Sequence, residues 1–256
     1  MLTITTKFNQ MNLLVCISKT PDTTSKISFK SDATEYNSDG ITFIMNPYDE
    51  WYALVKAIEL VEQNGGNVTV INVGPASNDI IIRKALAIGA NDAVRVDLEN
   101  GDAFAIASNI AAHAKSKSYD AIFTGKETID YNGSEVGAMV AELLDLPYIS
   151  YATQLTVGGG ISKVTREIEG GMEICEVEGP FVLSAAKGLA EQRIPNMKGI
   201  MMAKSKPLTI VAPVSDSARI KIEKFIVPPG KTGVKLIDPE NMDELVRLLH
   251  EESKVI

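Results

Sequence analysis

The residue types best suited to hold a ligand are concentrated between residues 124 and 137. This stretch carries two glycines, Gly125 and Gly133, among hydroxyl, carboxylate and amide side chains. It follows the apolar run Ala121–Phe123, which predicts a buried strand, and it precedes apolar residues at helical spacing. The first N–H groups of a helix lack internal partners and carry partial positive charge, so they can bind an anion. The stretch is therefore a candidate phosphate-binding loop.

An ordinary capped helix start is the other interpretation of this pattern. Many α/β folds place a polar, glycine-containing loop after a strand only to cap the next helix, and Asp130, Asn132 and Ser134 are candidate caps here. On the pattern alone, the two interpretations are equally supported. The surrounding elements have to decide between them.

Residues that would mark an enzyme do not form any known catalytic pattern. Both histidines, His113 and His250, fall on expected helices away from the glycine loops. The sequence has no Cys/His set at metal-ligand spacing, no Gly-x-Ser-x-Gly elbow and no Walker-type phosphate loop. Glu167 and Glu169 share one face of an expected strand, but a solvated pair beside a turn is the better interpretation. We expect no catalytic residue and no metal.

The composition indicates a globular protein that folds in water. Of the 256 residues, 45% are hydrophobic and 23% charged. A net charge of −8 disfavours nucleic acid and anionic membranes, because both carry like charge. No apolar run approaches the ~20 residues that span a bilayer. Cys16 and Cys175 lie in apolar runs, which favours reduced, packed thiols. We expect no nucleic-acid partner, no membrane insertion and a cytoplasmic location in a bacterium.

Strands and helices alternate through the first half of the chain. Strands are expected at 13–17, 68–73, 93–96 and 121–123, and helices at about 47–64, 79–89 and 102–114. Asn46 and Pro47 predict a helix start, with asparagine as the N-cap and proline in the first helical position. This rhythm predicts a doubly wound, mostly parallel sheet. The loops after the first, second and fourth strands should then meet, with Asn46, at one ligand-binding edge.

The rest of the chain has a different pattern. Residues 150–178 are expected to form an antiparallel β excursion with glycine turns. Residues 187–206 carry five basic side chains against one acid, which suits an acidic partner surface and a solvated loop equally well. We expect a leader or tag at 1–10, an α/β domain at 11–211 and an extended arm at 212–256 whose terminal helix packs on a partner.

Six motifs occur in a fixed order along the chain. They are Val15–Lys19 with Pro21 and Asp22, Asn46 with Pro47, Ile82–Ala90, Thr124–Asp130, Arg166–Gly171, and Gly188 and Leu189 with Arg193, Ile194 and Pro195. From Met11 to about Pro213 this set resembles the β (small) subunit of electron transfer flavoproteins. The resemblance implies an adenine-nucleotide α-hydrolase-like fold and a heterodimer with a larger α subunit that holds the redox FAD.

The resemblance also implies a role. The chain would be an electron carrier subunit rather than an enzyme, binding AMP structurally and forming a wall of the FAD site. Electrons would arrive from acyl-CoA dehydrogenases of fatty acid β-oxidation and leave to a quinone oxidoreductase.

Matched residue by residue, the resemblance implies three sets of contacts. AMP would contact Cys16, Asn46, Pro47, Tyr48, Asp49, Val73, Gly125, Lys126, Thr128, Asp130, Asn132, Gly133, Ser134, Glu135 and Val136. Thr23 and Tyr48 would approach the FAD. Leu189 would anchor a partner-recognition loop at about 185–205, with Lys187 and Arg193 beside it.

Residues 131–136 depart from the patterns of the family. They match neither the acidic run of the common one-flavin members nor the Gly-Asp-Thr pattern of bifurcating members, which bind a second FAD in place of AMP. We favour AMP. Two alternatives stay open: a bifurcating β subunit with a second FAD and NADH oxidation, and a stand-alone adenine-nucleotide-binding sensor.

Overall fold

A computed structural model describes residues 10–216, 218–231 and 233–256. The expected leader or tag therefore lies, apart from residue 10, outside the described residues. The strands are β1 (Met11–Cys16), β2 (Lys19–Pro21), β3 (Phe43–Met45), β4 (Gly66–Val73), β5 (Asp92–Val96), β6 (Ala121–Gly125), β7 (Tyr148–Gly158), β8 (Ile161–Ile168), β9 (Gly171–Glu178), β10 (Phe181–Ala185) and β11 (Leu208–Val211). The α-helices are α1 (Asp49–Asn64), α2 (Asp79–Ile88), α3 (Ala103–Lys115), α4 (Val136–Leu144), α5 (Met197–Ala203) and α6 (Met242–Arg247). A 3₁₀-helix, η1 (Ala76–Asn78), and a π-helix, η2 (Leu248–Ser253), complete the helices of the described residues.

The chain divides into two compact units. One contains Met1–Ser28 and Asn37–Ile222, and the other contains Phe29–Tyr36 and Glu223–Ile256. The first eleven residues of the expected arm, 212–222, thus belong to the first unit. They lie along α3, where the buried amide of Asn109 bonds the backbone of Val214 and Ser215.

The first unit is built on one nine-stranded sheet with strand order β11-β5-β4-β1-β6-β10-β7-β8-β9. Pairing is parallel from β11 to β7 and antiparallel from β7 to β9. The expected β excursion is therefore the continuation of the central sheet. A second sheet pairs β2 with β3, antiparallel. The predicted fold class, a doubly wound and mostly parallel α/β sheet with an antiparallel extension, is confirmed.

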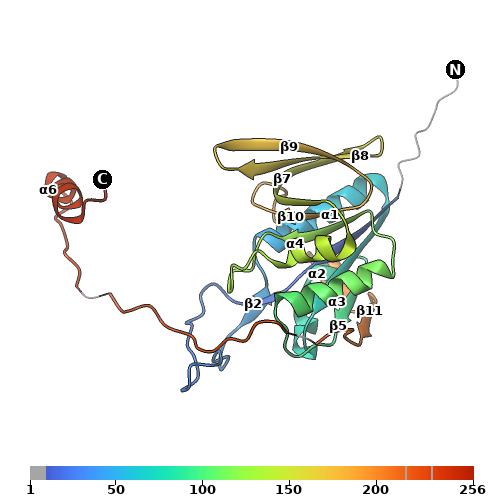
Figure 1. Ribbon diagram of the computed structural model, residues 1–256, viewed down its shortest axis with the longest axis horizontal. Coiled ribbons are helices and arrows are strands. Elements are labelled where there is room, and N and C mark those ends of the chain that lie inside the picture. The colour runs from blue at the N-terminus through green and yellow to red at the C-terminus, as the bar shows by residue number, and fades with distance from the viewer. Residues whose placement is uncertain (1–9, 217, 232) are drawn as a thin grey trace. The chain divides into compact units, whose positions relative to one another are not determined.

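Helices cover both faces of the parallel part of the sheet (Figure 1). Alternate residues of β1 point to opposite faces: Leu13 and Val15 join a core with α1 and α2, whereas Leu14 and Cys16 join a core with α3 and α4. This two-sided burial explains why the parallel strands are continuous apolar runs in the sequence.

The strand order reverses at β1. Strands β4 and β5 lie on one side of β1, and β6 and β10 lie on the other. In such sheets the loops at the carboxyl ends of the two strands at the reversal separate and leave a crevice, which is where ligands bind. Here the two strands are β1 and β6, which end at Cys16 and Gly125, so the fold predicts the crevice beside these two residues.

The second unit is held together by an aromatic cluster. The rings of Phe29 and Phe225 stack with centroids 4.5 Å apart, and Tyr36 packs edge-on against Phe29 at 6.5 Å. The backbone N–H of Phe225 donates to the carbonyl of Ala33 at 2.8 Å. Residues 29–36 thus hold the chain at Phe225, and the arm beyond it presents apolar side chains to solvent.

Replacing Phe225 with alanine should release the arm without unfolding the sheet, because a stacked aromatic pair contributes about 0.5–1.5 kcal/mol beyond its buried area. We expect faster amide exchange at residue 225 and faster proteolysis of residues 226–256, with an unchanged urea midpoint for the α/β unit. Ile226→Ala is the matched control, since that side chain is 83% exposed. Equal exchange rates in both variants would show that the aromatic cluster does not hold the arm.

Candidate functional site

The crevice at the reversal of strand order gathers residues that are far apart in the sequence. Cys16 ends β1, Gly125 ends β6, and Asn46 directly follows β3. All three belong to the set for which the sequence predicts nucleotide contacts. Burial raises the pKa of Cys16 far above its usual range, so the thiol stays protonated and serves as an apolar wall.

Asn46 connects the two loops that border the crevice. Its Nδ2 donates to the carbonyl of Glu127 at 3.1 Å, and its Oδ1 accepts from the N–H of Ile129 at 3.1 Å. Its backbone N–H donates to the carbonyl of Ser18 at 2.9 Å. A fully buried amide with every group bonded fixes the loop after β6 against the loop after β1.

The prediction that Asn46 is the N-cap and Pro47 the first residue of a helix is wrong. Helix α1 begins at Asp49, and Tyr48 precedes it with φ 66° and ψ −105°. The reason is that the Asn46 amide is bonded to residues 127 and 129, so it cannot cap α1. A tyrosine with positive φ stores about 1–3 kcal/mol of strain, and such residues cluster at functional sites. The Tyr48 side chain is half-exposed.

The start of α4 lies open beside this pair of loops. Glu135 occupies the N-cap position without a side-chain hydrogen bond, and Asp130, Asn132 and Ser134 do not cap α4 either. Asn132 and Ser134 have positive φ values of 50° and 54°. Without a capping side chain, the N–H groups of the first turn remain available to an anion. The capped-start interpretation therefore does not hold for this loop.

Close packing below α4 depends on Gly137. A Cβ at this position would lie 2.7 Å from Thr124 Oγ1 and 3.1 Å from the Tyr148 ring, so only glycine fits. The first turn of α4 therefore packs directly against Thr124, near the end of β6. The exposed residues of the loop, 130–135, surround this start.

Lys126 directly follows Gly125 at the end of β6. It forms an ion pair with Glu127, its Nζ lies 4.0 Å from Asp49 Oδ2, and it faces the ring of Tyr151 at 5.8 Å. The hydrogen bond to Glu127 raises the pKa of Lys126, so it stays charged. Burial raises the pKa of Asp49 to about 6. A lysine flanked by two carboxylates keeps its charge and offers a positive group at this edge of the sheet.

Three further predicted site residues lie at the margins. Val73 ends β4, the neighbour of β1 on the far side from β6, and Pro47 is buried beside Asn46. Thr23 is exposed in the loop that follows β2. The loop from Lys126 to Val136 carries the remaining positions, including Thr128 and Gly133.

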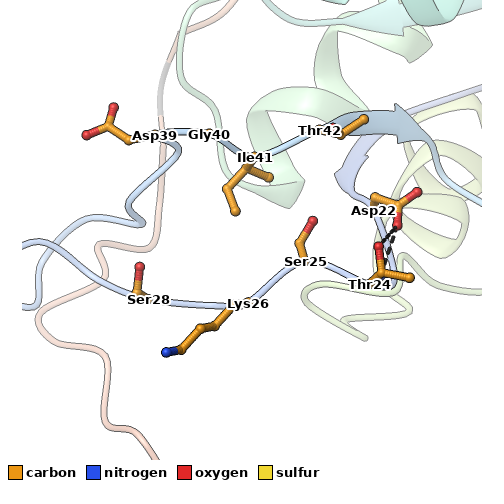
Figure 2. Close-up of a pocket in the computed structure, with 9 residues that line it drawn as sticks. All are labelled: Asp22, Thr24, Ser25, Lys26, Ser28, Asp39, Gly40, Ile41 and Thr42. Atoms are coloured by element: carbon orange, nitrogen blue, oxygen red, sulfur yellow. Dashed lines mark hydrogen bonds between the residues drawn. The ribbon is translucent and has the colours of Figure 1, made fainter.

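An open cavity lies elsewhere, between residues 22–28 and 39–42 (Figure 2). It measures about 620 Å³, is wide open, and is lined by polar side chains such as Ser28 and Asp39. Asp22 turns back to Thr24, with its Oδ1 accepting from the hydroxyl at 2.6 Å. The cavity contains none of the residues that Asn46 brings together, so it is separate from the edge of the sheet that the strand order indicates.

Comparison with known proteins identifies the family. The family model described as the electron transfer flavoprotein domain matches residues 35–216. The chain belongs to the electron transfer flavoprotein family. The β subunit of electron transfer flavoprotein from Bacillus subtilis (strain 168) is 36% identical over 262 residues, covering 96% of this chain and 100% of that protein. The human β subunit is 32% identical over 257 residues, covering 96% and 99%.

Membership in this family makes the chain a β subunit with a role in electron transfer, and it implies an α subunit as partner and flavin at the level of the heterodimer. The described ranges contain no helix long and apolar enough to cross a membrane. The same ranges contain no cluster of His, Cys, Asp and Glu suited to a metal ion.

In this electron transfer flavoprotein chain, the segment expected to recognise a partner, at about 185–205, does not expose the residue expected to anchor it. Leu189 is only 3% exposed and packs in the hydrophobic core, so it is not a surface anchor in this structure. Arg193 pairs with Glu62 through two bonds of 2.7 and 2.9 Å, and its carbonyl accepts from Trp51 Nε1 at 3.1 Å. Lys187 is exposed. Large apolar side chains of this segment also face solvent: Ile194 is 83% exposed and Met197 74%.

Replacing Asn46 with leucine should loosen both loops, because it leaves a buried carbonyl and a buried N–H without partners. We expect a loss of about 1–3 kcal/mol in the free energy of unfolding and faster amide exchange at Ile129. Asn64→Leu, at the other end of α1, removes a single bond from Asn64 Nδ2 to the carbonyl of Leu60 and serves as the control. Unchanged protection of Ile129 would mean that Asn46 does not fix the loop.

Proposed function

We propose that this chain is the β subunit of a heterodimeric electron transfer flavoprotein in the bacterial cytoplasm. It accepts electrons from acyl-CoA dehydrogenases, passes them to a quinone oxidoreductase and binds AMP as a structural ligand. The observation that supports AMP is the uncapped start of α4 beside the loop that Asn46 fixes, at the reversal of strand order. The site offers binding groups for an anionic nucleotide and no candidate catalytic group that would react with it.

The residues of the crevice fit the parts of AMP. The first-turn N–H groups of α4, with Lys126 close by, suit the phosphate. Cys16 and Val73 supply apolar surface for the adenine. Asn132 and Ser134, both with positive φ, shape the loop around the ligand. Asn46, Pro47 and Asp49 close the side that faces α1.

The flavin itself belongs mainly to the α subunit, where FAD supplies the capacity to carry one or two electrons. Tyr48 and Thr23 are exposed at the same edge of this chain and form its wall toward that flavin. The strained backbone of Tyr48 supports this role, because it holds a large side chain out toward solvent instead of into the core.

The arm at 212–256 provides the main contact surface for the α subunit. Its second part, beyond Phe225, exposes several large apolar side chains that this chain leaves uncovered: Ile226, Val227, Val234, Leu236 and Val246. Leu236 is 89% exposed. Apolar side chains at this density mark a protein contact surface.

The dehydrogenase contacts the segment around α5. Ile194, Met197 and Met201 form an exposed apolar group, with Lys198 and Lys204 beside them. Arg193 and Leu189 support this surface from beneath, one through Glu62 and the other through the core. An apolar centre within a basic rim suits an acidic partner surface.

Nucleotide content of the purified heterodimer tests the proposal for the crevice. We expect one FAD and one AMP per heterodimer, and a loss of AMP of about tenfold in Gly125→Ala, since a Cβ there would lie 3.0 Å from the backbone N of Glu50. Gly158→Ala, with no atom within 4 Å of its Cβ, is the control. Two FAD and no AMP would replace the proposal with a bifurcating role. A stable nucleotide-binding monomer would favour the sensor.

Electron transfer kinetics test the dehydrogenase surface. Met197→Glu should slow reduction by acyl-CoA dehydrogenase about tenfold or more while the flavin content stays unchanged, because it places a charge in the apolar centre. Leu189→Ala should instead lower the free energy of unfolding by about 2–5 kcal/mol, as expected for a buried leucine. Normal kinetics in Met197→Glu would move the contact away from α5.

A further inference from the structure

Glu50 is a buried carboxyl group that the nucleotide contacts do not use. It is the second residue of α1 and only 6% exposed. Both of its oxygens accept from one residue: the N–H of Ser18 donates to Oε2 at 2.7 Å, and the Ser18 hydroxyl donates to Oε1 at 2.7 Å. The two residues are 32 positions apart in the sequence, so this contact fixes tertiary structure rather than a local turn.

The other side of Glu50 packs against the end of β6. A Cβ added to Gly125 would lie 2.8 Å from Glu50 Cγ and 3.0 Å from its backbone N. Glu50 therefore lies between the carboxyl ends of β1 and β6, the two strands at the reversal. The carbonyl of Ser18 also accepts a hydrogen bond, from the N–H of Asn46. Every polar group of Ser18 is thus bonded to the segment that starts α1.

We propose that Glu50 is a positioning residue of the nucleotide site, which acts by clamping Ser18 so that the loop after β1 stays in place against the loop after β6. The inference rests on the AMP site proposed above. Without the clamp, the stretch from Cys16 to Ser18 separates from Gly125 and the crevice loses its shape. Glu50 itself does not touch the ligand in this scheme.

Hydrogen bonding, rather than charge, carries the clamp. The Ser18 hydroxyl can rotate, so it donates to a carboxylate and accepts from a carboxyl O–H or an amide N–H. A glutamine at position 50 can therefore accept from the Ser18 N–H and donate to the hydroxyl. Leucine has a similar size but can do neither. The two variants separate the loss of hydrogen bonds from the loss of charge.

The charged and titratable groups around Glu50 come from three elements. Asp49 lies next to it on α1, Asp130 lies on the loop after β6, and the Cys16 thiol lies at the end of β1. Lys126 and Glu127 face Asp49.

Burial, the largest cause, raises the pKa of Glu50 to about 8; the nearby carboxylates of Asp130 and Asp49 contribute to this rise, and the hydrogen bonds from Ser18 oppose the shift. The folded chain therefore retains this proton at pH values where the unfolded chain, with a pKa near 4.3, has lost it. Stability should fall as the pH rises from about 4.3 to about 8, and less so in Glu50→Gln.

Amide exchange and AMP content of the heterodimer test the clamp. In Glu50→Leu we expect the Ser18 amide to exchange about tenfold faster and the AMP retained after gel filtration to fall about tenfold. In Glu50→Gln both quantities should stay within about twofold of the wild type. Glu62→Leu is the control on the same helix, since Glu62 also accepts two bonds from one residue but is exposed. Asn109→Ala controls for general destabilisation, because its amide is buried and bonded far from the crevice.

Several results would overturn the proposal. They are wild-type exchange at Ser18 in Glu50→Leu, equal defects in the glutamine and leucine variants, or loss of AMP in Asn109→Ala to the same extent. If the wild-type heterodimer binds no AMP, the proposed function of the crevice fails. The exchange rates at Ser18 then still decide whether Glu50 clamps the two loops.

Discussion

A single buried side-chain amide joins the parts of this chain that meet at its ligand edge. Asn46 bonds two backbone groups more than 80 residues away, at Glu127 and Ile129, and its own N–H reaches Ser18. A buried amide without such partners would cost roughly 1–3 kcal/mol, so the loops must adopt the conformation that satisfies it. Asn46 thus fixes Ser18 and the loop at residues 127–129 relative to each other, and α1 begins only at Asp49.

The pattern of the sequence predicts the sheet well because the parallel strands are buried on both faces. Runs such as Leu13–Ile17 and Ala121–Phe123 have to be continuous and apolar, and helices have to alternate with them. The edge proposed for the nucleotide follows from the same pattern, since the reversal of strand order places the carboxyl ends of two strands side by side. These inferences depend on local periodicity, which one sequence contains.

Long-range hydrogen bonds are what the sequence does not disclose. The pair Asn46 and Pro47 is typical of a helix start, but the amide is bonded to a distant loop and the helix begins at Asp49. Glu50 carries no signal at all, because its partner Ser18 has no special spacing from it. The basic segment gives a third case. Lys206 donates to carbonyls at the carboxyl end of α2, and Arg193 pairs with Glu62. A count of basic residues in the sequence therefore overstates the number that are available to a partner.

The aromatic cluster of the second unit also has a consequence for the order of folding. Phe29 and Phe225 are 196 positions apart in the sequence, and the stack can form only when both residues are present. A ribosome adds about 5–20 residues per second, so Phe29 is made roughly 10–40 s before Phe225 exists. All strands of the nine-stranded sheet precede Phe225 in the chain. The surface proposed to contact the α subunit is therefore completed last, when the nine-stranded sheet can already have formed.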